Sequence, residues 1–367
     1  MTIEFGERIR RIPSYPLAAG YDLGEGTAML ASNESCLAPR AEVVEAAQRA
    51  LSGVHRYPDP SYAALRRALS DRYGIPRERI ALGNGSCDIL LSAGEALLEH
   101  GAEVVYGWPA FSVYPHLAAA SGARAIQVPL DSEDRHDLDA MAAEITVATR
   151  LVLICNPNNP TSTSLPLEAV AEFMTRVPRH VCVILDEAYI EFALAVGDTY
   201  ASVELLRRWP NLVLLRTFSK AYSLAGLRVG YALCGSEQFR AAVDQVRQPF
   251  YLNVAAQAAA VEALRYQDDV ERRVIHTVAG RRELTDGMRE LGLWVAESDA
   301  NFVWTHLPRD IDESEVISGL SSRGVLVRAG SALGRAGSLR VTIGTDVENG
   351  RFLGALGEMM DRERPPP

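Results

Sequence analysis

The sequence of 367 residues has little of what would build a disulfide framework, a metal site or a membrane span. Its five cysteines are widely spaced and contain no CxxC pair, so we expect reduced thiols. The seven histidines show no HExxH pattern and no paired Cys and His spacing, so no metal site is predicted. Strongly apolar runs such as residues 181–185 are far shorter than the roughly 18 residues of a membrane span.

Clustered positive charge is also scarce, since the formal net charge is −10. Sequence-independent nucleic-acid affinity rests on Lys and Arg clusters, so we expect no nucleic-acid partner. The first residues, MTIEFGERIRR, carry mixed charge with no apolar segment behind them, which predicts a cytoplasmic location. Neither the GxGxxG of dinucleotide folds nor a P-loop occurs, so those two phosphate-binding motifs are excluded.

From about residue 40 to 250, helical periodicity alternates with short apolar runs that are typical of buried strands. Such alternation predicts an α/β fold, with a doubly wound, mostly parallel sheet and helices on both faces. We expect strands over residues 103–106, 125–128, 151–154, 181–185, 212–215 and 228–234. We expect helices over residues 86–98, 112–121, 166–176 and 236–247.

The chain changes character after about residue 253, where a long helical stretch is followed by strand candidates at 301–307, 324–328 and 338–344. This pattern predicts a smaller α+β domain at the C-terminal end of the chain. The expected organisation is therefore an N-terminal arm (1–30), a large domain (31–252) and a small domain (253–367).

Three polar clusters come directly after predicted buried strands, at residues 155–162, 186–192 and 216–231. Ligands of doubly wound folds gather at these strand ends. In the last cluster Lys220 has Thr217, Ser219 and Arg228 nearby, a grouping that suits a phosphate beside an amine. A lysine buried near cations is available as a neutral amine, so chemistry on an aldehyde cofactor is reasonable here.

Asp186 ends the most apolar strand, where a carboxylate is costly without a partner. One interpretation is a cap of the turn after the strand, and the other is an ion pair with a pyridinium nitrogen. The segment GNGSCD (83–88) lies between a predicted strand and a helix, so its backbone N–H groups suit either a phosphate or an ordinary N-cap.

These clusters resemble the fold-type I pyridoxal-phosphate aminotransferases, and within them the histidinol-phosphate aminotransferases. The resemblance covers nearly the whole chain and implies an aspartate-aminotransferase-like large domain. The motifs that carry it are LASNES (30–35), HRYPDPSYAALRRAL (55–69), GNGS (83–86), FSVY (111–114), NPNNPT (156–161), DEAYIEF (186–192), TFSKAYSLAGLRVGY (217–231), ANFVW (300–304), GVLVR (324–328) and LRVTIGT (339–345).

The resemblance implies a pyridoxal 5'-phosphate cofactor held as a Schiff base on Lys220, which then moves the proton at the substrate carbon. Asp186 is expected to pair with the pyridine nitrogen, Asn159 and Tyr189 to bond the phenolic oxygen, and Phe111 to stack on the ring. The cofactor phosphate is expected to be held by the backbone of Ser86 and Cys87 and by the side chains of Thr217, Ser219 and Arg228.

For the substrates, the resemblance implies that Arg340 binds an acidic group through its bidentate fork. Asn33 and Arg328 match positions near the distal end of the substrate. Tyr57 matches a tyrosine that reaches the cofactor phosphate of a neighbouring subunit, which implies a homodimer. The implied reaction transfers an amino group between L-histidinol phosphate and 2-oxoglutarate, in histidine biosynthesis.

Three departures from the family pattern leave other functions open. Ser35-Cys36 replaces the usual Asn-Pro, Cys87 replaces an acidic residue, and Ser162 replaces a glycine that permits unusual backbone angles. An aromatic amino acid aminotransferase and a pyridoxal-phosphate-dependent decarboxylase of a phosphorylated amino acid are the alternatives. A cofactor-binding regulator without turnover is a third, although the chain lacks a basic DNA-binding module.

Overall fold

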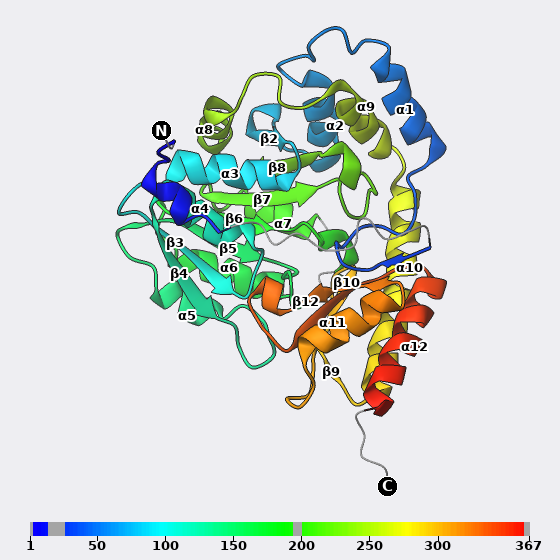
Figure 1. The fold of residues 1–367 in the computed structure, drawn as a ribbon. Coiled ribbons are helices and arrows are strands. Elements are labelled where there is room, and N and C mark those ends of the chain that lie inside the picture. The colour runs from blue at the N-terminus through cyan, green and yellow to red at the C-terminus, as the bar shows by residue number, and fades with distance from the viewer. Residues whose placement is uncertain (1–2, 14–25, 194–199, 363–367) are drawn as a thin grey trace.

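The computed structural model describes residues 3–13, 26–193 and 200–362 (Figure 1). Its strands are β1 (Ala28–Met29), β2 (Ile80–Gly83), β3 (Glu103–Trp108), β4 (Arg124–Pro129), β5 (Thr149–Cys155), β6 (Cys182–Asp186), β7 (Leu212–Thr217), β8 (Gly230–Cys234), β9 (Trp294–Val295), β10 (Phe302–His306), β11 (Val325–Leu326), β12 (Arg328–Ala329) and β13 (Ser338–Thr342).

The α-helices are α1 (Ala41–Leu51), α2 (Ala63–Tyr73), α3 (Ser86–Leu97), α4 (Val113–Ser121), α5 (Leu138–Ala143), α6 (Leu167–Arg176), α7 (Ala201–Leu205), α8 (Glu237–Val246), α9 (Val254–Ala263), α10 (Gln267–Glu290), α11 (Glu313–Ser322) and α12 (Asp346–Arg362). Short 3₁₀ turns include η1 (Glu7–Arg10), η3 (Ile190–Phe192) and η6 (Ser331–Leu333). None of the helices in the described ranges is long and apolar enough to span a membrane.

The large sheet has seven strands in the order β2-β8-β7-β6-β5-β3-β4. Strands β4, β3, β5, β6 and β7 are parallel to one another, whereas β8 is antiparallel to both β7 and β2. The predicted α/β class with a mostly parallel sheet is confirmed. The direction of β8 was not foreseen, because a buried apolar run has the same pattern in either orientation.

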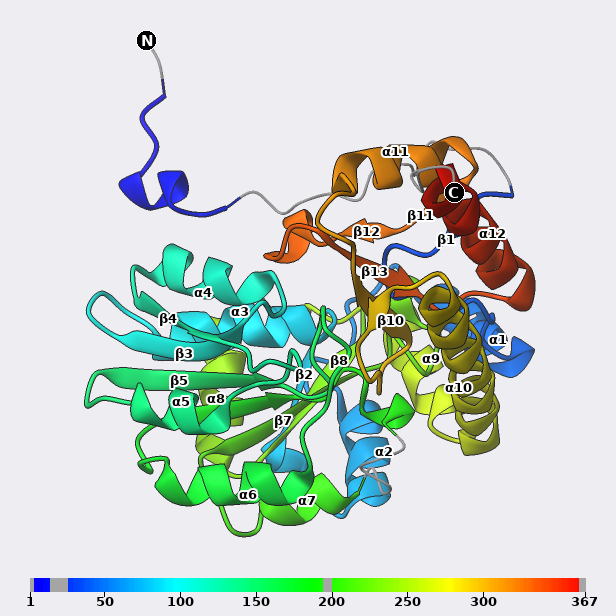
Figure 2. The same cartoon turned by 90° about the horizontal axis from the view of Figure 1, so that it is seen from below.

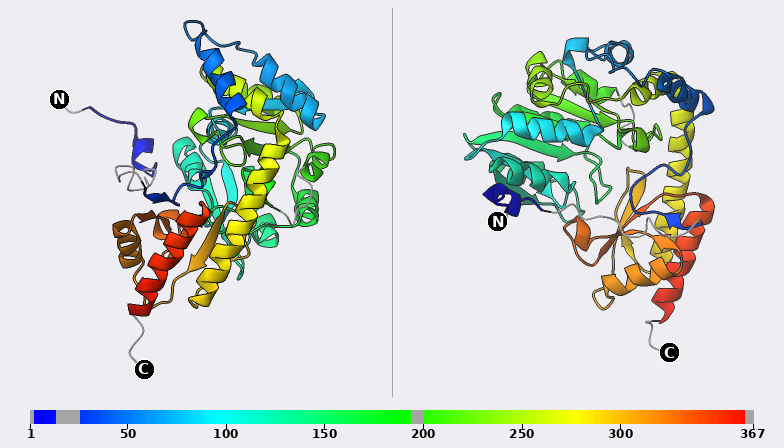
Figure 3. Two further views of the ribbon diagram at one scale, coloured as in Figure 1. Left: turned by 90° about the vertical axis from the view of Figure 1, so that its right-hand side faces the viewer. Right: turned by 45° about the horizontal axis from the view of Figure 1, so that its top comes forward.

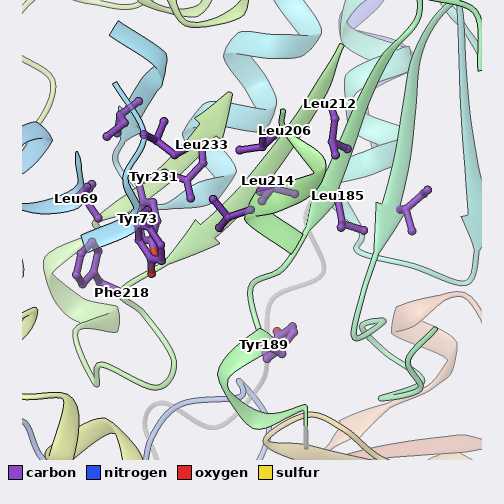
Figure 4. Packing of buried hydrophobic residues seen from close by; sticks show 14 of the residues in the cluster. Leu69, Tyr73, Leu185, Tyr189, Leu206, Leu212, Leu214, Phe218, Tyr231 and Leu233 are labelled. Carbon is purple, nitrogen blue, oxygen red and sulfur yellow. The ribbon is translucent and has the colours of Figure 1, made fainter. Parts of the chain in front are cut away.

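Helices cover both faces of the large sheet (Figure 2). One apolar core joins a face of the sheet to α3, α4 and α8, for example through Ile89, Leu117 and Val243. The other face packs on α2, α5, α6 and α7, where Leu69, Tyr73, Leu206 and Leu214 lie in one cluster (Figure 4). Burying the sheet on both sides leaves its strand ends as the accessible edge for a site.

Strand β4 differs from the expectation of a strand buried on both faces. It lies at the edge of the sheet, and of its six residues only Val128 is buried. An edge strand has a single neighbour, so its side chains need less apolar character than those of a central strand.

The smaller C-terminal sheet is antiparallel, with the order β12-β13-β10-β9. Its core joins the sheet to α10, α11 and α12 through residues such as Leu284, Val316 and Phe352. The predicted strand at 324–328 is divided, because β11 pairs in parallel with β1 while β12 joins the sheet. A segment from the start of the chain therefore packs on the small sheet unit (Figure 1).

The long helix α10 runs from the large unit to the small one (Figure 3). Before it, α9 packs against α1 and α2, and its residues Ala256, Ala259 and Ala260 belong to the core beneath the large sheet. The division at residues 30 and 252 remains a proposal. Residues 1–2 and 14–25 of the arm lie outside the described residues.

Candidate active site

The three polar clusters meet at the carboxyl ends of β5, β6 and β7, in a cavity of about 420 Å³. That volume lies within the ordinary range for a small-molecule site. Except for Tyr57, every site residue predicted from the sequence lines this cavity: Asn33, Ser86, Cys87, Phe111, Asn159, Asp186, Tyr189, Thr217, Ser219, Lys220, Arg228, Arg328 and Arg340.

Lys220 projects into this cavity just beyond the end of β7. Its Nζ donates to the carbonyl oxygens of Asn33 at 2.9 Å and Ser32 at 3.2 Å, and lies 5.7 Å from the ring centre of Tyr189. Burial and, to a smaller extent, the nearby Arg340 lower the pKa of the Lys220 amine from 10.5 to about 7. A large fraction of the amine is therefore neutral near pH 7 and able to act as a nucleophile.

Asp186 is the last residue of β6 and is only 3% exposed. Its Oδ2 accepts from the Tyr114 hydroxyl at 3.0 Å, and its Oδ1 accepts from the backbone N–H of Ala188 at 3.2 Å. Burial raises the pKa of this carboxyl to about 6. No cation pairs with it among the ion pairs of the described residues, so a buried carboxylate faces the cavity without a counter-charge.

Asn33 and Tyr189 are joined by a hydrogen bond, with the Asn33 amide donating to the Tyr189 hydroxyl at 3.0 Å. Burial raises the pKa of that hydroxyl, which keeps it protonated and able to donate. Asn159 accepts from Nη1 of Arg340 at 2.6 Å through its Oδ1, which leaves its NH₂ group as a donor. Both Tyr189 and Asn159 thus bring donors to the same cavity.

An anion-binding corner lies at the N-terminus of α3. The helix begins at Ser86 after Gly85, whose φ of +77° suits glycine, and first-turn N–H groups have no acceptor within their helix. The Arg228 guanidinium lies over Gly85, where a Cβ would overlap it, and reaches the Ser219 hydroxyl at 3.4 Å. Thr217 donates to Ser219 at 3.0 Å, so two hydroxyls complete the corner.

The backbone permits this corner only because of one further glycine. Gly230 in β8 pairs with Gly83 in β2, and a Cβ at Gly230 would overlap the backbone nitrogen of Ser86. No carboxylate pairs with Arg228 among the ion pairs of the described residues. A helix N-terminus, a guanidinium and two hydroxyls together form a site for a phosphate group.

Arg328 and Arg340 enter the cavity from the small sheet. They are partners in the register of β12 and β13, and both are buried. Besides its bond to Asn159, Arg340 donates to the carbonyl of Ala31 at 2.5 Å. The small sheet therefore contributes two positive charges to the cavity.

Tyr57 is the predicted residue that the structure does not bring to the cavity. Its side chain is 81% exposed and stacks on Phe250 with ring centres 4.5 Å apart. Its expected role in the site of a neighbouring subunit stays a prediction.

The departures at residues 87 and 162 have different structural settings. Cys87 lies in the first turn of α3, and burial raises the pKa of its thiol to about 11. Ser162 is fully buried with a φ of +63°, a backbone angle that favours glycine. Neither Cys87 nor Ser162 takes part in the contacts of Lys220 and Asp186 that are described above.

Tyr114 is a site residue that sequence reasoning missed. It lies in the first turn of α4, three residues after Phe111, and it holds the Asp186 carboxylate with its hydroxyl. Phe111 and Tyr114 are three residues apart, so they lie on one side of a helical turn, and both belong to the FSVY motif that resembles the family. Spacing within that segment was the available signal.

The residues fit one kind of group: an aldehyde that condenses with Lys220, a cationic ring nitrogen that pairs with Asp186, and a phosphate in the α3 corner. Pyridoxal phosphate combines these three features. The Asp186 carboxylate and the Arg228 guanidinium support the fit, because both are hydrogen-bonded but neither has an ion-pair partner among the described residues. Fold and site together define a fold-type I pyridoxal-phosphate enzyme.

Comparison with known proteins identifies the family. The profile of "Aminotransferase class I and II" matches residues 26–356. The chain is 43% identical to histidinol-phosphate aminotransferase 2 of Ralstonia nicotianae over 97% of both chains. It is 44% identical to the aromatic amino acid aminotransferase of Thermobifida fusca over 89% of both chains.

Among solved structures, histidinol-phosphate aminotransferase from Sinorhizobium meliloti in complex with pyridoxal-5'-phosphate matches with a TM-score of 0.88 and 28% identity, over 99% of both chains. The chain belongs to the class I and II aminotransferases. It is a pyridoxal-phosphate-dependent enzyme of the histidinol-phosphate and aromatic aminotransferase group.

Proposed function

We propose that the protein transfers an amino group between L-histidinol phosphate and 2-oxoglutarate, as a step of histidine biosynthesis in the cytoplasm. The observation that supports this choice is the pair Arg328 and Arg340, which face the same cavity from adjacent strands. A phosphate monoester carries nearly two negative charges and three strong acceptor oxygens. Two guanidinium groups complement that charge better than they complement a single carboxylate.

The same pair serves the second substrate, because 2-oxoglutarate and glutamate carry a carboxylate at each end. One site must accept both substrates in turn, and an acidic group is the feature that they share. Family membership favours amino transfer over the decarboxylase alternative. The similarity to a relative named histidinol-phosphate aminotransferase 2 is consistent with this proposal.

When bound, pyridoxal phosphate supplies an aldehyde for the amine exchange and a ring that accepts electrons. In this proposal the Lys220 amine, with its pKa of about 7, takes the proton from the substrate carbon and returns it. Asp186 would pair with the ring nitrogen and keep it protonated. Tyr189 and Asn159 would donate hydrogen bonds to the ring oxygen, while Arg340 would hold the acidic group of the substrate.

The phosphate end of the substrate is testable through Arg328. Replacing Arg328 with Gln removes one charge from the pair, and a charge-assisted contact contributes about 1.5–3 kcal/mol. We expect the rate of cofactor conversion by L-histidinol phosphate, divided by its half-saturation concentration, to fall about 10- to 100-fold. Single-turnover absorbance of the bound cofactor measures this rate.

Arg289 offers a matched control, because it is an exposed arginine of the small unit whose partner is Glu297. Arg289→Gln should leave the rate unchanged. Failure of L-histidinol phosphate to convert the cofactor of the unaltered protein would rule out the proposed substrate.

An aromatic amino acid is the second candidate, favoured by the similarity to the Thermobifida fusca enzyme. The cavity also contains Phe111 and Leu333, which offer apolar surface to a ring. Phenylalanine has one carboxylate, so its use should depend on Arg340 and little on Arg328. Comparing both substrates in the Arg328→Gln variant therefore separates the two functions.

A homodimer with shared sites is part of the proposal, since Tyr57 is exposed on its own subunit. If Tyr57 acts in the site of the other subunit, mixing Lys220→Ala and Tyr57→Ala subunits restores one complete site per mixed dimer. Activity should then exceed that of either variant alone. Absence of any recovery in verified mixed dimers would place Tyr57 outside the active site.

A further inference from the structure

Asp134 lies at the tip of the turn between β4 and α5, far along the chain from every predicted site residue of the large sheet. It adopts a left-handed backbone angle, φ +59°, which aspartate tolerates better than most residues. Its neighbour Asp131 builds the turn by accepting the backbone N–H groups of Glu133 and Arg135, both at 2.8 Å. The Asp134 side chain is left to point outward from the turn.

The Asp134 carboxylate is nevertheless only 1% exposed, because the small sheet unit covers it. It accepts from Trp304 Nε1 at 3.0 Å and contacts His306 Nε2 at 2.9 Å, both on β10. Arg335, which follows η6, forms an ion pair with its other oxygen. Burial acts to raise the pKa of this carboxyl, but His306 and Arg335 together hold it below its usual value, so the group is ionised at neutral pH.

All three donors come from the small unit, and two of them support one residue of the cavity wall. Leu333 lines the cavity and packs with Trp304 in a separate apolar cluster. Two residues after Leu333, Arg335 continues the same turn, whose backbone closes through Arg335 N–H to the Gly330 carbonyl at 2.9 Å. Leu333 is therefore held in two ways: its side chain packs on Trp304, and its backbone belongs to the turn that Arg335 closes. Both Trp304 and Arg335 contact Asp134.

This turn also connects the two substrate arginines. Arg328 lies on β12 before η6, and Arg340 lies on β13 after it. Gly334 within the turn lies against the Trp108 ring of the large sheet, where a Cβ would overlap the indole. The β12–η6–β13 segment thus forms the substrate side of the cavity. It contacts the large sheet unit through Gly334 against Trp108 and through Arg335 against Asp134.

We propose that Asp134 is a positioning residue that fixes the substrate wall, Arg328, Leu333 and Arg340, against the cofactor side of the active site. Asp134 does not line the cavity, so it acts through Trp304 and Arg335. A displaced wall holds the acidic group of the substrate less firmly, so donor binding weakens while the groups that react stay in position. Cofactor contacts from the large sheet stay in place.

The test measures the half-reaction of the holoenzyme with L-histidinol phosphate, L-phenylalanine and L-glutamate, using the donor that reacts fastest. In Asp134→Asn we expect the donor KM to rise at least about tenfold, with kcat within about threefold, because the wall holds substrate and not the reacting atoms. Cofactor affinity, from absorbance titration, should change less than about twofold. Asp134→Glu should recover part of the loss, because the negative charge is kept.

Asp131→Asn is the matched control, since it disturbs the same turn without touching the small unit. It should leave the donor KM unchanged. Arg335→Gln, on a half-exposed side chain, tests the same contact from the other end if an Asp134 variant fails to fold. Combining Asp134→Asn with Arg335→Gln should cost no more than Asp134→Asn alone, since they remove one shared contact.

Three results would overturn the proposal. The first is a donor KM that stays within about twofold of the unaltered protein in both Asp134→Asn and Arg335→Gln. The second is a double variant whose loss equals the sum of the two single losses. The third is a loss of cofactor affinity as large as the loss of donor use. The last result would assign Asp134 a general structural role.

Discussion

Replacing Asp186 with Asn should change the stability of the apoprotein and its affinity for the cofactor in opposite directions. The carboxyl of Asp186 is buried without a cation, and its pKa rises from 3.8 to about 6. Each pKa unit corresponds to about 1.4 kcal/mol, so the ionised group destabilises the folded apoprotein by about 3 kcal/mol at pH 8. Asn removes the charge but satisfies only one of the donors Tyr114 and Ala188, which costs about 1 kcal/mol.

The apoprotein of Asp186→Asn should therefore be more stable than the unaltered apoprotein by about 2 kcal/mol at pH 8. The sign of the pH effect follows from the raised pKa. The destabilisation by Asp186 is fully present above about pH 6 and disappears as the pH falls toward the unfolded value of 3.8. Urea unfolding at about pH 8 and about pH 4.5 should show the gain shrinking at the lower pH.

The holoenzyme should respond in the other direction, because removing one partner of a buried ion pair costs about 3–5 kcal/mol. We expect cofactor affinity to fall at least about 100-fold, measured by absorbance titration of the apoprotein. The adjacent Glu187 supplies the control, since its carboxylate is equally buried but paired with Arg216 at 2.8 Å. Glu187→Gln should destabilise the apoprotein. If Asp186→Asn destabilised it similarly, Asp186 would already have a partner, and the argument for a missing cation would be wrong.

Four further results are expected. Lys220→Ala should abolish the visible absorbance of the imine and nearly all turnover, which spectra and a coupled assay measure. Arg340→Ala should mainly weaken substrate use, seen as a higher KM with retained cofactor absorbance. Capture of pyridoxal by the apoprotein should speed up with pH and level off above about pH 7, because the pKa of Lys220 is lowered to about 7; a rate still rising at pH 9 would contradict this. Ser162→Gly should raise the free energy of unfolding, measured in urea, by about 1 kcal/mol, since it relieves a left-handed angle and a buried hydroxyl without a partner among the described residues.

The positions of the site residues could be predicted because the sequence shows where the buried strands end. The apolar runs at 151–154, 181–185 and 212–215 mark β5, β6 and β7, and the polar clusters that follow them must lie at one edge of a parallel sheet. Lys220 and Asp186 then enter one cavity from neighbouring strands. This part of the site requires no knowledge of side-chain contacts.

Contacts between segments that lie far apart in the chain could not be predicted from the sequence in the same way. Tyr114 reaches Asp186 across 72 residues of chain, and a tyrosine after an aromatic segment has the composition of ordinary core. Arg340 bonds to Asn159 and to the Ala31 carbonyl, so its orientation depends on three separate segments. Periodicity reports which face a residue occupies and carries no information about its partner.

The chemistry of the site depends on which sheet supplies its negative charge and which sheet supplies its positive charges. The large sheet holds Asp186, which has no ion-pair partner among the described residues, and the small sheet adds Arg328 and Arg340 to the same cavity. Lys220 lines the same cavity, and its pKa falls because it is buried and because Arg340 repels its charge. Moving the small unit away would therefore release the substrate wall and also raise the pKa of the amine. Since Asp134 joins the two units through Arg335 and Trp304, the binding of substrate depends on how these units meet.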